Sequence, residues 1–266
     1  MAIPKALEPT GVILVDKPAG PSSFAVLAGV RSRTRAKTGH AGTLDPFATG
    51  LLILLSGRAT TMASCFVGLP KRYVTDVDLS RRTTTGDPEG ESLEAHEPPS
   101  AAELESALER LRGEIELPIP TASAVKIGGE RAYKLHRQGV VVEMPLRRSQ
   151  VDALDVITYS EGIARLDLHV SSGTYVRSIA DALGGHCITL RRTEVGPFTV
   201  EEADAERVRP LDETLARIGL TVAEAEAERQ RKASSDRAAQ EARQEARQAA
   251  ERGGAATATP ERGVGG

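Results

Sequence analysis

The sequence has few aromatic residues: Phe, Trp and Tyr make up 3% of its 266 residues, and there is no Trp. A hydrophobic core must therefore be built from Leu, Val, Ile and Ala, and hydrophobic residues still reach 40% of the chain. A chain of this length can bury one sizeable core or two small ones. Because aromatic residues are scarce, each Tyr or Phe beside a motif is informative.

Cysteines are equally scarce. Cys65 and Cys187 stand alone, which argues against a disulfide framework and favours a reduced, cytoplasmic setting. The sequence has no His-x-x-Glu-His, Cys-x-x-Cys or Walker-type glycine loop, so nothing supports a metal or nucleotide cofactor. No apolar run approaches the roughly 20 residues that span a bilayer, and no basic and then apolar leader opens the chain. We expect a soluble, cytoplasmic protein without cofactors or membrane contact.

The net charge of −3 does not by itself indicate a nucleic-acid partner, but the charges are segregated along the chain. Eight Lys and Arg lie in residues 17–72, where Asp45 is the only acid. Ten acids against two Arg follow in residues 87–116, and basic residues again dominate 126–148, six against two. Such segregation favours a polyanion bound on one face, with an ordinary solvated surface as the alternative for any single cluster.

The most distinctive segment is residues 39–50, Gly-His-Ala-Gly-Thr-Leu-Asp-Pro-Phe-Ala-Thr-Gly, which precedes the apolar run 51–55. The pattern predicts a loop followed by a buried strand. Pro46 pushes Asp45 toward an extended conformation, and a carboxylate in basic surroundings should stay ionised. A Cβ would obstruct the backbone geometry expected at the three glycines, Gly39, Gly42 and Gly50. From chemistry alone, a turn that caps the next element explains Asp45 equally well.

This segment resembles the catalytic motif of the TruB family, the bacterial tRNA pseudouridine-55 synthases, in which the Asp is the nucleophile. Residues 16–23, Asp-Lys-Pro-Ala-Gly-Pro-Ser-Ser, resemble the family's first motif, whose Lys and Pro help build the floor of the active site. Residues 173–177, Gly-Thr-Tyr-Val-Arg, resemble the motif whose Arg pairs with the catalytic Asp and whose Tyr touches the target base. Leu190-Arg191-Arg192 resembles the Leu-Arg-Arg strand of the same family. The resemblance covers roughly residues 11–198.

The resemblance implies a role for each residue of the site. Asp45 would be the nucleophile, and whether it adds to C6 of the base or to C1′ of the ribose stays open. Arg177 would keep Asp45 ionised and aimed. Tyr73 would stack on the extruded uracil, and His40 would occupy or prop the vacated stack. The rest of the predicted substrate site is Lys17, Tyr175 and Leu190.

Other basic residues are candidate phosphate contacts on the segment that grips the RNA stem in the family. They are Arg131, Lys134, Arg137, Arg147 and Arg148. Two departures from the family's pattern stand out. Thr84 replaces an Asp in the usual Thr-Asp-Thr triplet, which puts that residue's hydrogen bond in doubt, and the connection at 184–187 is shorter than usual, which could move Leu190.

Hydrophobic patterns predict strands near 11–16, 51–55, 71–79, 151–159 and 163–171. Ser22 or Ser23 should cap a helix with Phe24, Leu27 and Val30 on one face, and Ser100 with Glu103 predicts a capping box. With the resemblance, these elements imply an α+β fold with a pseudouridine-synthase-like mixed, mainly antiparallel central sheet flanked by helices and loops.

Three regions are expected along the chain. Residues 1–185 would form the catalytic domain, and 186–220 a C-terminal strand and helix segment packed on it. Residues 221–266 are rich in Ala, Glu, Arg and Gln, with the repeat Glu-Ala-Arg-Gln at 241–248, and predict a disordered tail or a solvated helix. No PUA domain, the module with which many relatives bind the tRNA acceptor end, is evident.

The resemblance therefore predicts an isomerase that converts the T-loop uridine at position 55 of tRNA to pseudouridine. Its partner would be the T-stem and loop of tRNA, and it would act as a monomer without an obligate protein partner. A glycosidase with an Asp nucleophile is a rival, but it needs a second carboxylate about 5–10 Å away. A non-catalytic RNA-binding module needs no nucleophile, and an RNA-guided relative from ribonucleoprotein particles is less consistent with the missing PUA domain.

Overall fold

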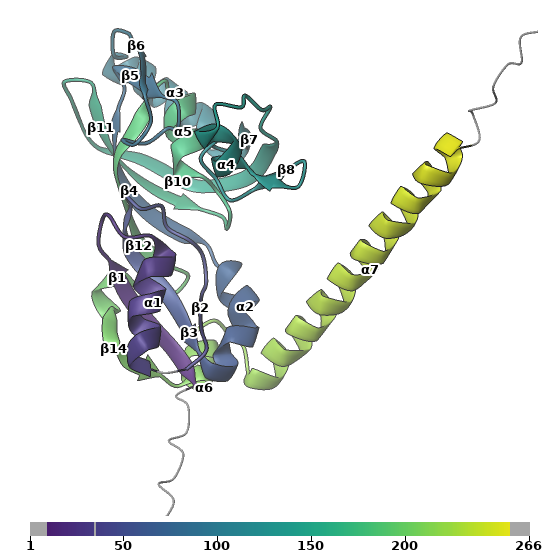
Figure 1. The fold of residues 1–266 in the computed structure, drawn as a ribbon. Coiled ribbons are helices and arrows are strands. Elements are labelled where there is room, and N and C mark those ends of the chain that lie inside the picture. The colour runs from purple at the N-terminus through teal and green to yellow at the C-terminus, as the bar shows by residue number, and fades with distance from the viewer. Residues whose placement is uncertain (1–9, 35, 256–266) are drawn as a thin grey trace, which may run out of the picture. The chain divides into compact units, whose positions relative to one another are not determined.

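The computed structural model describes residues 10–34 and 36–255 of the chain. The chain divides into two compact units between Gly219 and Leu220, and each is described by itself. The larger unit contains the strands and all helices but the last (Figure 1).

The larger unit is organised by one sheet of ten strands, eight of which form a continuous path. In spatial order these are β14 (Asp204–Arg209), β1 (Gly11–Lys17), β3 (Thr49–Ser56), β12 (His186–Val195), β4 (Lys71–Asp78), β11 (Ile163–Val170), β10 (Leu146–Ser160) and β7 (Gly113–Pro118). Two short strands lie off this path: β2 (Thr38–His40) pairs with β3, and β13 (Phe198–Thr199) pairs with β12.

All neighbouring pairs in this sheet are antiparallel except β3 with β12, which run parallel. In Figure 1, β4 and β12 lie in the middle of the larger unit. β12 is antiparallel to β4 along most of its length, and it pairs with β3 only at Arg191 and Arg192. The mixed, mainly antiparallel sheet confirms the predicted fold class.

Short helices and hairpins connect the strands. The helices of the larger unit are α1 (Ser23–Thr34), η1 (Gly57–Met62), α2 (Ala63–Val67), α3 (Ala101–Leu111), α4 (Ala132–Arg137), α5 (Val176–Ala182), η2 (Val200–Glu202) and α6 (Leu211–Ala216). The hairpins are β5 (Arg81–Thr83) with β6 (Ser92–Ala95), and β8 (Lys126–Ile127) with β9 (Glu130–Arg131). The predicted capping box at Ser100 and Glu103 is confirmed at the start of α3.

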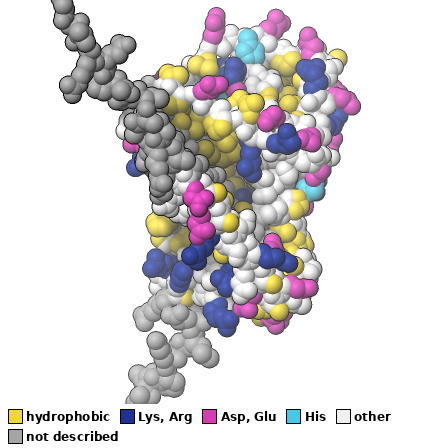
Figure 2. Space-filling view, turned by 90° about the vertical axis from the view of Figure 1, so that its right-hand side faces the viewer, with side chains coloured by type: hydrophobic (Ala, Val, Ile, Leu, Met, Phe, Trp, Pro, Cys, Tyr) yellow, Lys and Arg dark blue, Asp and Glu magenta, His cyan; other side chains and the backbone are white. Residues whose placement is uncertain are grey.

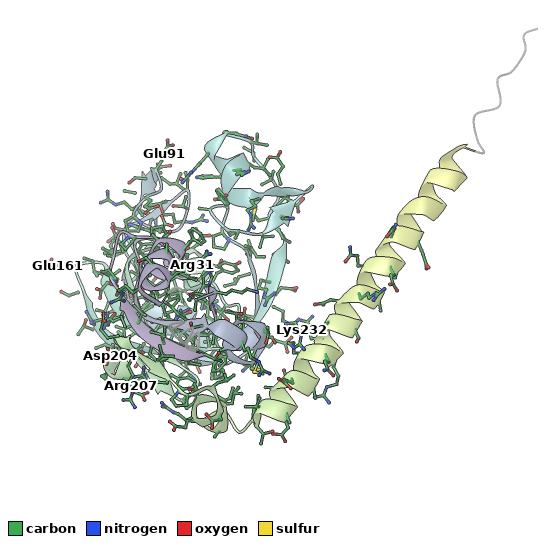
Figure 3. All side chains as sticks on the ribbon, turned by 60° about the horizontal axis from the view of Figure 1, so that its bottom comes forward. Arg31, Glu91, Glu161, Asp204, Arg207 and Lys232 are labelled. Carbon is green, nitrogen blue, oxygen red and sulfur yellow. The ribbon has the colours of Figure 1, made fainter. Side chains whose placement is uncertain are left out.

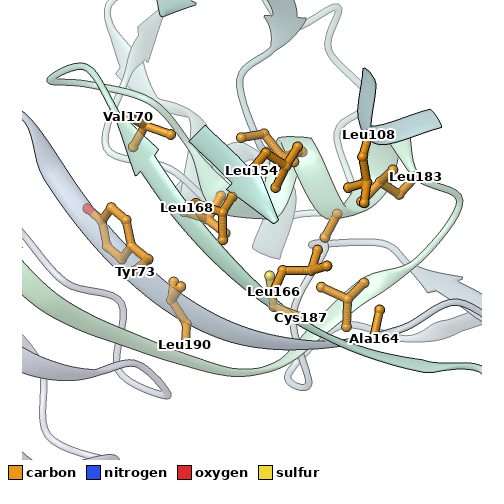
Figure 4. Packing of buried hydrophobic residues seen from close by; sticks show 14 of the residues in the cluster. Tyr73, Leu108, Leu154, Ala164, Leu166, Leu168, Val170, Leu183, Cys187 and Leu190 are labelled. Atoms are coloured by element: carbon orange, nitrogen blue, oxygen red, sulfur yellow. The ribbon is translucent and has the colours of Figure 1, made fainter. Parts of the chain in front are cut away.

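The core is built from aliphatic side chains, as the shortage of aromatic residues requires. One cluster gathers residues of β4, β10, β11, α5 and β12 together with Leu44 and Ala48 (Figure 4). A second cluster packs α1 on β1 and β3. Leu27 and Val30 of α1 are buried as predicted, but Phe24 is 69% exposed. The prediction that Phe24 shares their buried face is therefore wrong.

Several acidic side chains lie at the outside of the larger unit. Figure 3 shows Glu91, Glu161 and Asp204 at its periphery, pointing away from the sheet. The smaller unit contains α7 (Val222–Ala255), whose described side chains from Arg229 to Glu245 are all exposed. One pair along it, Arg237 and Glu241, is joined at 3.1 Å with helical i,i+4 spacing. The end of the predicted tail, 256–266, lies outside the described residues.

Candidate active site

Asp45 lies in the connection between β2 and β3. We call residues 42–50 the Asp45 loop. Gly42 and Gly50 both have positive φ, +95° and +102°, and a Cβ on Gly50 would lie 2.2 Å from the carbonyl oxygen of Arg192. Both glycines are therefore required, as predicted. Gly39 is different, because its φ is not positive and the nearest atom to an added Cβ is 3.9 Å away, so the prediction for Gly39 is wrong.

Buried side chains bind the backbone of the Asp45 loop. The Oγ of Ser23 accepts a hydrogen bond from Leu44 N at 2.8 Å and donates one to Leu44 O at 2.9 Å, so it holds both sides of the residue before Asp45. Gly20 N donates to Pro46 O at 2.8 Å. Because the loop's polar groups are bonded inside the protein, its conformation is set before any substrate arrives.

Lys17 is the second buried side chain beneath this loop. Its ammonium donates to the carbonyl oxygens of Pro18 at 2.9 Å, Pro46 at 3.0 Å and Ala48 at 2.7 Å, and the residue is 0% exposed. An ammonium has three protons, and all three have protein acceptors. The predicted substrate contact of Lys17 is therefore corrected: the side chain supports the Asp45 loop from inside the protein and is not available to a substrate.

Arg177 joins Asp45 to a second carboxylate. It is 3% exposed at the start of α5, and its Nε lies 2.9 Å from Asp45 Oδ2, within ion-pair distance but outside hydrogen-bond geometry. Its Nη2 donates to Asp45 Oδ1 at 3.3 Å, and its Nη1 donates to Asp87 Oδ2 at 3.0 Å. The guanidinium also donates to the carbonyls of Thr85 and Ala122. Arg177 therefore contacts two carboxylates, the partly exposed Asp45 and the buried Asp87.

The ionisation of Asp45 depends on opposing influences. Burial is the largest and raises the pKa of the carboxyl, and the charge of Asp87 acts in the same direction. Arg177 and Lys17 lower the pKa, but the net direction is upward. Desolvation of the partly buried carboxylate, whose side chain is 33% exposed, outweighs its basic neighbours, and the expectation that Asp45 stays ionised remains a prediction.

Tyr73 and Leu190 lie beside the Asp45 loop. Both belong to the larger core cluster, which also contains Leu44 and Ala48 of that loop, and Figure 4 shows their two side chains close together on β4 and β12. Leu190 pairs with Thr75 and is 6% exposed, so the short connection before β12 leaves it inside the cluster. Two strands that are distant in sequence, β4 and β12, thus contribute to one core cluster with residues of the loop.

Tyr175 and His40 complete the set of predicted residues. Tyr175 is half-buried at the N-cap of α5, and burial raises the pKa of its phenol. It lines a small pocket with Ile115, Leu117, Arg147, Ser149, Thr174, Ser178 and Ile179. His40 lies at the end of β2, where its buried Nδ1 has no hydrogen-bond partner among the described residues. Burial, and then the charge of Arg192, lower the pKa of the imidazole.

Several contributors to this site were not assigned from the sequence. Asp87 was given no role, although it is 5% exposed and accepts from Arg177, from Thr85 Oγ1 at 2.6 Å and from Glu89 N at 3.0 Å. The signal was available, because Asp87 follows two Thr and a Gly in a turn-forming segment. Thr84 Oγ1 accepts from Glu91 N at 3.1 Å in the β5–β6 connection, so this position still makes a local hydrogen bond.

The predicted phosphate contacts lie at the surface. All five, Arg131, Lys134, Arg137, Arg147 and Arg148, are exposed. Arg148 pairs with Glu114 at 3.1 Å, and the Arg137 guanidinium lies 5.8 Å from the centre of the Tyr133 ring. Figure 2 shows that hydrophobic side chains gather in a hollow on one face, with Lys and Arg around it.

The described residues lack two kinds of feature. They contain no cluster of three or more His, Cys, Asp or Glu placed to hold a metal ion. Within the described ranges, no helix combines the length and the apolar character needed to cross a membrane.

Comparison with known proteins identifies the family. The model of the "TruB family pseudouridylate synthase (N terminal domain)" matches residues 31–176, which include the Asp45 loop. The chain belongs to the TruB family. It is accordingly an enzyme of the isomerase class, as predicted.

Relatives named tRNA pseudouridine synthase B extend the match beyond that region. The one from Mycobacterium sp. (strain KMS) is 40% identical over 249 residues, and the match covers 84% of this chain and 84% of the relative. Those from Mycobacterium tuberculosis (strain ATCC 25618 / H37Rv) and Corynebacterium efficiens are also 40% identical, each over 243 residues. Each match covers 82% of this chain, and they cover 81% and 82% of the respective relative.

Solved structures of the TruB family's wider fold are also similar. A chain in the crystal structure of a Cbf5-Nop10-Gar1 complex is 30% identical with a TM-score of 0.55 over 71% of this chain. A chain in an H/ACA RNP bound to a substrate RNA containing 2′-deoxyuridine is 26% identical with a TM-score of 0.52, again over 71%. This chain spans about half the length of each, 50% and 48%. They support the pseudouridine-synthase fold.

Proposed function

We propose that the protein isomerises the T-loop uridine at position 55 of tRNA to pseudouridine, with Asp45 as the nucleophile. The observation that carries this proposal is the Asp45 carboxylate, fixed on a bonded loop and in contact at 2.9 Å with the buried Arg177. The relatives named tRNA pseudouridine synthase B support tRNA as the substrate.

In the proposed reaction, Asp45 adds to C6 of the uracil or to C1′ of the ribose. The glycosidic bond between N1 and C1′ breaks, the uracil rotates, and C5 bonds to C1′. The bond from Asp45 also breaks, which frees the carboxylate. C5 loses its proton and N1 gains one, so the product is an isomer and needs neither redox chemistry nor an energy source. Arg177 holds Asp45 in place and opposes the effect of burial on its ionisation.

The base is extruded from the T-loop to reach Asp45. Tyr73 stacks on it, Tyr175 and Leu190 complete the pocket, and His40 occupies the vacated stack. Extrusion costs a few kcal/mol, and base stacking on an aromatic ring returns about 1–3 kcal/mol. A half-buried imidazole whose pKa is lowered is mostly neutral at pH 7, which suits stacking against bases.

The glycosidase alternative requires a second carboxylate beside the nucleophile, and Asp87 is the candidate that the structure adds. However, Asp87 is 5% exposed and already accepts hydrogen bonds from Arg177, Thr85 and Glu89. A carboxylate occupied in this way is poorly suited to activating a water. This favours the isomerase reading of the pair, in which Asp87 supports Arg177.

The protein is proposed to act alone, as a cytoplasmic monomer with tRNA as its only partner. The solved neighbours named above come from complexes with other proteins, so this point needs a direct test.

The experiment maps pseudouridine, nucleotide by nucleotide, on an unmodified tRNA transcript treated with the purified protein and nothing else. We expect product at the T-loop uridine from the wild type. Asp45→Asn should be at least about a thousandfold slower, because it lacks the nucleophile. Asp152→Asn, an exposed carboxylate on β10 beside His169, is the matched control and should act as the wild type does.

Each part of the proposal has its own contrary outcome. Product at another uridine would refute the position, and product from Asp45→Asn at the wild-type rate would refute the nucleophile. If the wild type binds the transcript tightly but forms no product until another protein or a guide RNA is added, independent action is refuted.

A further inference from the structure

Arg192 has the largest fully buried side chain among the described residues, and the proposed reaction does not use it. It lies on β12, two residues after Leu190, and is 1% exposed. Arg is almost never buried to this extent without a carboxylate partner. No carboxylate among the described residues lies within ion-pair distance of Arg192, so something other than charge pairing has to explain its position.

The guanidinium of Arg192 binds the two ends of the Asp45 loop. Its Nη2 donates to Gly42 O at 3.1 Å, where the loop begins, and its Nε donates to Leu51 O at 2.7 Å, immediately after the loop ends. A guanidinium is planar and its N–H groups have fixed directions, so these two bonds fix the separation of the two carbonyls.

The backbone of Arg192 is also in contact with the loop. Arg192 pairs with Gly50 where β12 runs parallel to β3, and a Cβ on Gly50 would lie 2.2 Å from Arg192 O and 2.8 Å from Arg192 N. The end of the loop therefore lies directly on the main chain of Arg192, while the side chain reaches back to its beginning. One residue holds both ends of the segment that carries Asp45.

The unpaired charge of Arg192 acts on its surroundings. After burial, it is the next influence that lowers the pKa of His40, and likewise that of Lys71, whose pKa falls to about 8. An apolar side chain could fill the same space without this effect. The charge and the two directed hydrogen bonds are therefore separable properties, which an experiment can tell apart.

We propose that Arg192 is a positioning residue for the reaction: it fixes the Asp45 loop at both ends and so determines where Asp45 stands relative to the base. This inference rests on the proposed function. It needs no contact between Arg192 and the substrate.

The test compares Arg192→Lys with Arg192→Met in single-turnover kinetics on the tRNA transcript. Lys keeps the charge but cannot reproduce the planar fork, so kcat should fall about 10- to 100-fold while KM changes less than about threefold. The kcat of Arg192→Met should fall by at least the same factor. Arg165→Lys and Arg165→Met, at an exposed Arg that pairs with Asp76 on β4, are the matched controls and should keep the wild-type kcat.

A nuclear magnetic resonance titration of His40 supplies a second readout, which reports the charge of Arg192 separately from its two hydrogen bonds. The pKa of His40 should rise in Arg192→Met, because the charge is gone, and stay at the wild-type value in Arg192→Lys. Thermal melts of each variant show that the rates refer to folded protein. If wild type itself forms no pseudouridine, the proposed function fails, whereas the titration still reports on the charge.

Three results would overturn the inference. A folded Arg192→Lys variant with the wild-type kcat would show that the planar guanidinium does not position Asp45. A rise in KM with kcat unchanged would show that Arg192 serves RNA binding. If neither variant folds, Arg192 is a folding residue and the positioning role is rejected.

Discussion

The Asp45 loop and the segment 119–145 are both irregular in backbone, yet they are held in opposite ways. In the loop, alternate carbonyls, those of Gly42, Leu44, Pro46 and Ala48, accept hydrogen bonds from buried side chains. Segment 119–145 has two strands of two residues, a helix of six, and a Val141 that is 97% exposed. The part proposed to act on the base is thus ordered in advance, whereas the part proposed to grip RNA has little core of its own.

This difference has an energetic meaning. Ordering a residue costs about 1–2 kcal/mol of backbone entropy, and in the Asp45 loop that cost is met during folding. For segment 119–145, any further ordering would weaken binding. Substitutions in the two regions should therefore affect different kinetic parameters, kcat in the loop and KM in the segment.

Arg177→Met should give the largest effect. It removes the charge shared by Asp45 and Asp87, and breaking a buried ion pair on one side costs about 3–5 kcal/mol. We expect kcat to fall about a thousandfold or more. Since Arg177 is the largest influence that lowers the pKa of Asp45, its loss raises that pKa further, and the acid limb of the rate profile should move to higher pH. Single-turnover rates across pH measure both.

Arg165→Met is the control for this change and should leave the profile where it is. An acid limb that stays in place in Arg177→Met would show that Arg177 does not govern the ionisation of Asp45.

Lys17→Met should have an intermediate effect. It leaves the carbonyl of Ala48 without its donor, and a buried unsatisfied polar group costs about 1–3 kcal/mol. We expect urea denaturation to show a loss of this size in the free energy of unfolding, with kcat lower by about tenfold and KM unchanged. Lys37→Met, at an exposed Lys, should change neither. If KM rises instead, Lys17 contacts the substrate after all.

Substitutions in segment 119–145 should have the smallest effect. Lys134→Ala with Arg137→Ala removes two exposed charges, so KM should rise a few-fold at physiological salt while kcat stays the same. The salt dependence of binding should become shallower, by about 0.7–0.9 in the slope of log K against log salt for each phosphate that the variant no longer neutralises. A drop in kcat would mean that the segment also shapes the site for chemistry.

Much of the site was predictable from residue types and local order. The strand at 11–17, the loop with Asp45 and the capping box of Ser100 follow from local rules, and the resemblance supplied the Asp45–Arg177 pair. The resemblance placed Lys17 in the substrate site, and no local pattern shows that its ammonium donates to Pro46 O and Ala48 O, 29 and 31 residues away.

Arg192 and Phe24 both show burial that local sequence patterns fail to predict: a polar residue is buried and an apolar one is exposed. The polar Arg192 is buried because Gly42 and Leu51 offer carbonyls 150 and 141 positions earlier in the chain, a match that no periodicity encodes. Phe24 sits on the apolar stripe of α1 by helical spacing, but the helix packs on β1 and β3 through Leu27 and Val30. In both cases tertiary packing determines whether the side chain is buried, and the local sequence pattern does not.

The position of β12 also has a consequence for how the chain folds as it is made. Its residues 186–195 lie between β3 and β4, which are joined into one sheet only through this strand. A chain still on the ribosome and not yet extended past residue 186 holds β1 with β3 as one fragment and β4, β11, β10 and β7 as another. Strand pairings this distant in sequence form slowly, because the chain loses the entropy of loop closure before the new contacts stabilise it. Synthesis must therefore pass residue 195 before the nucleophile's loop and the strands facing it can become one folded body.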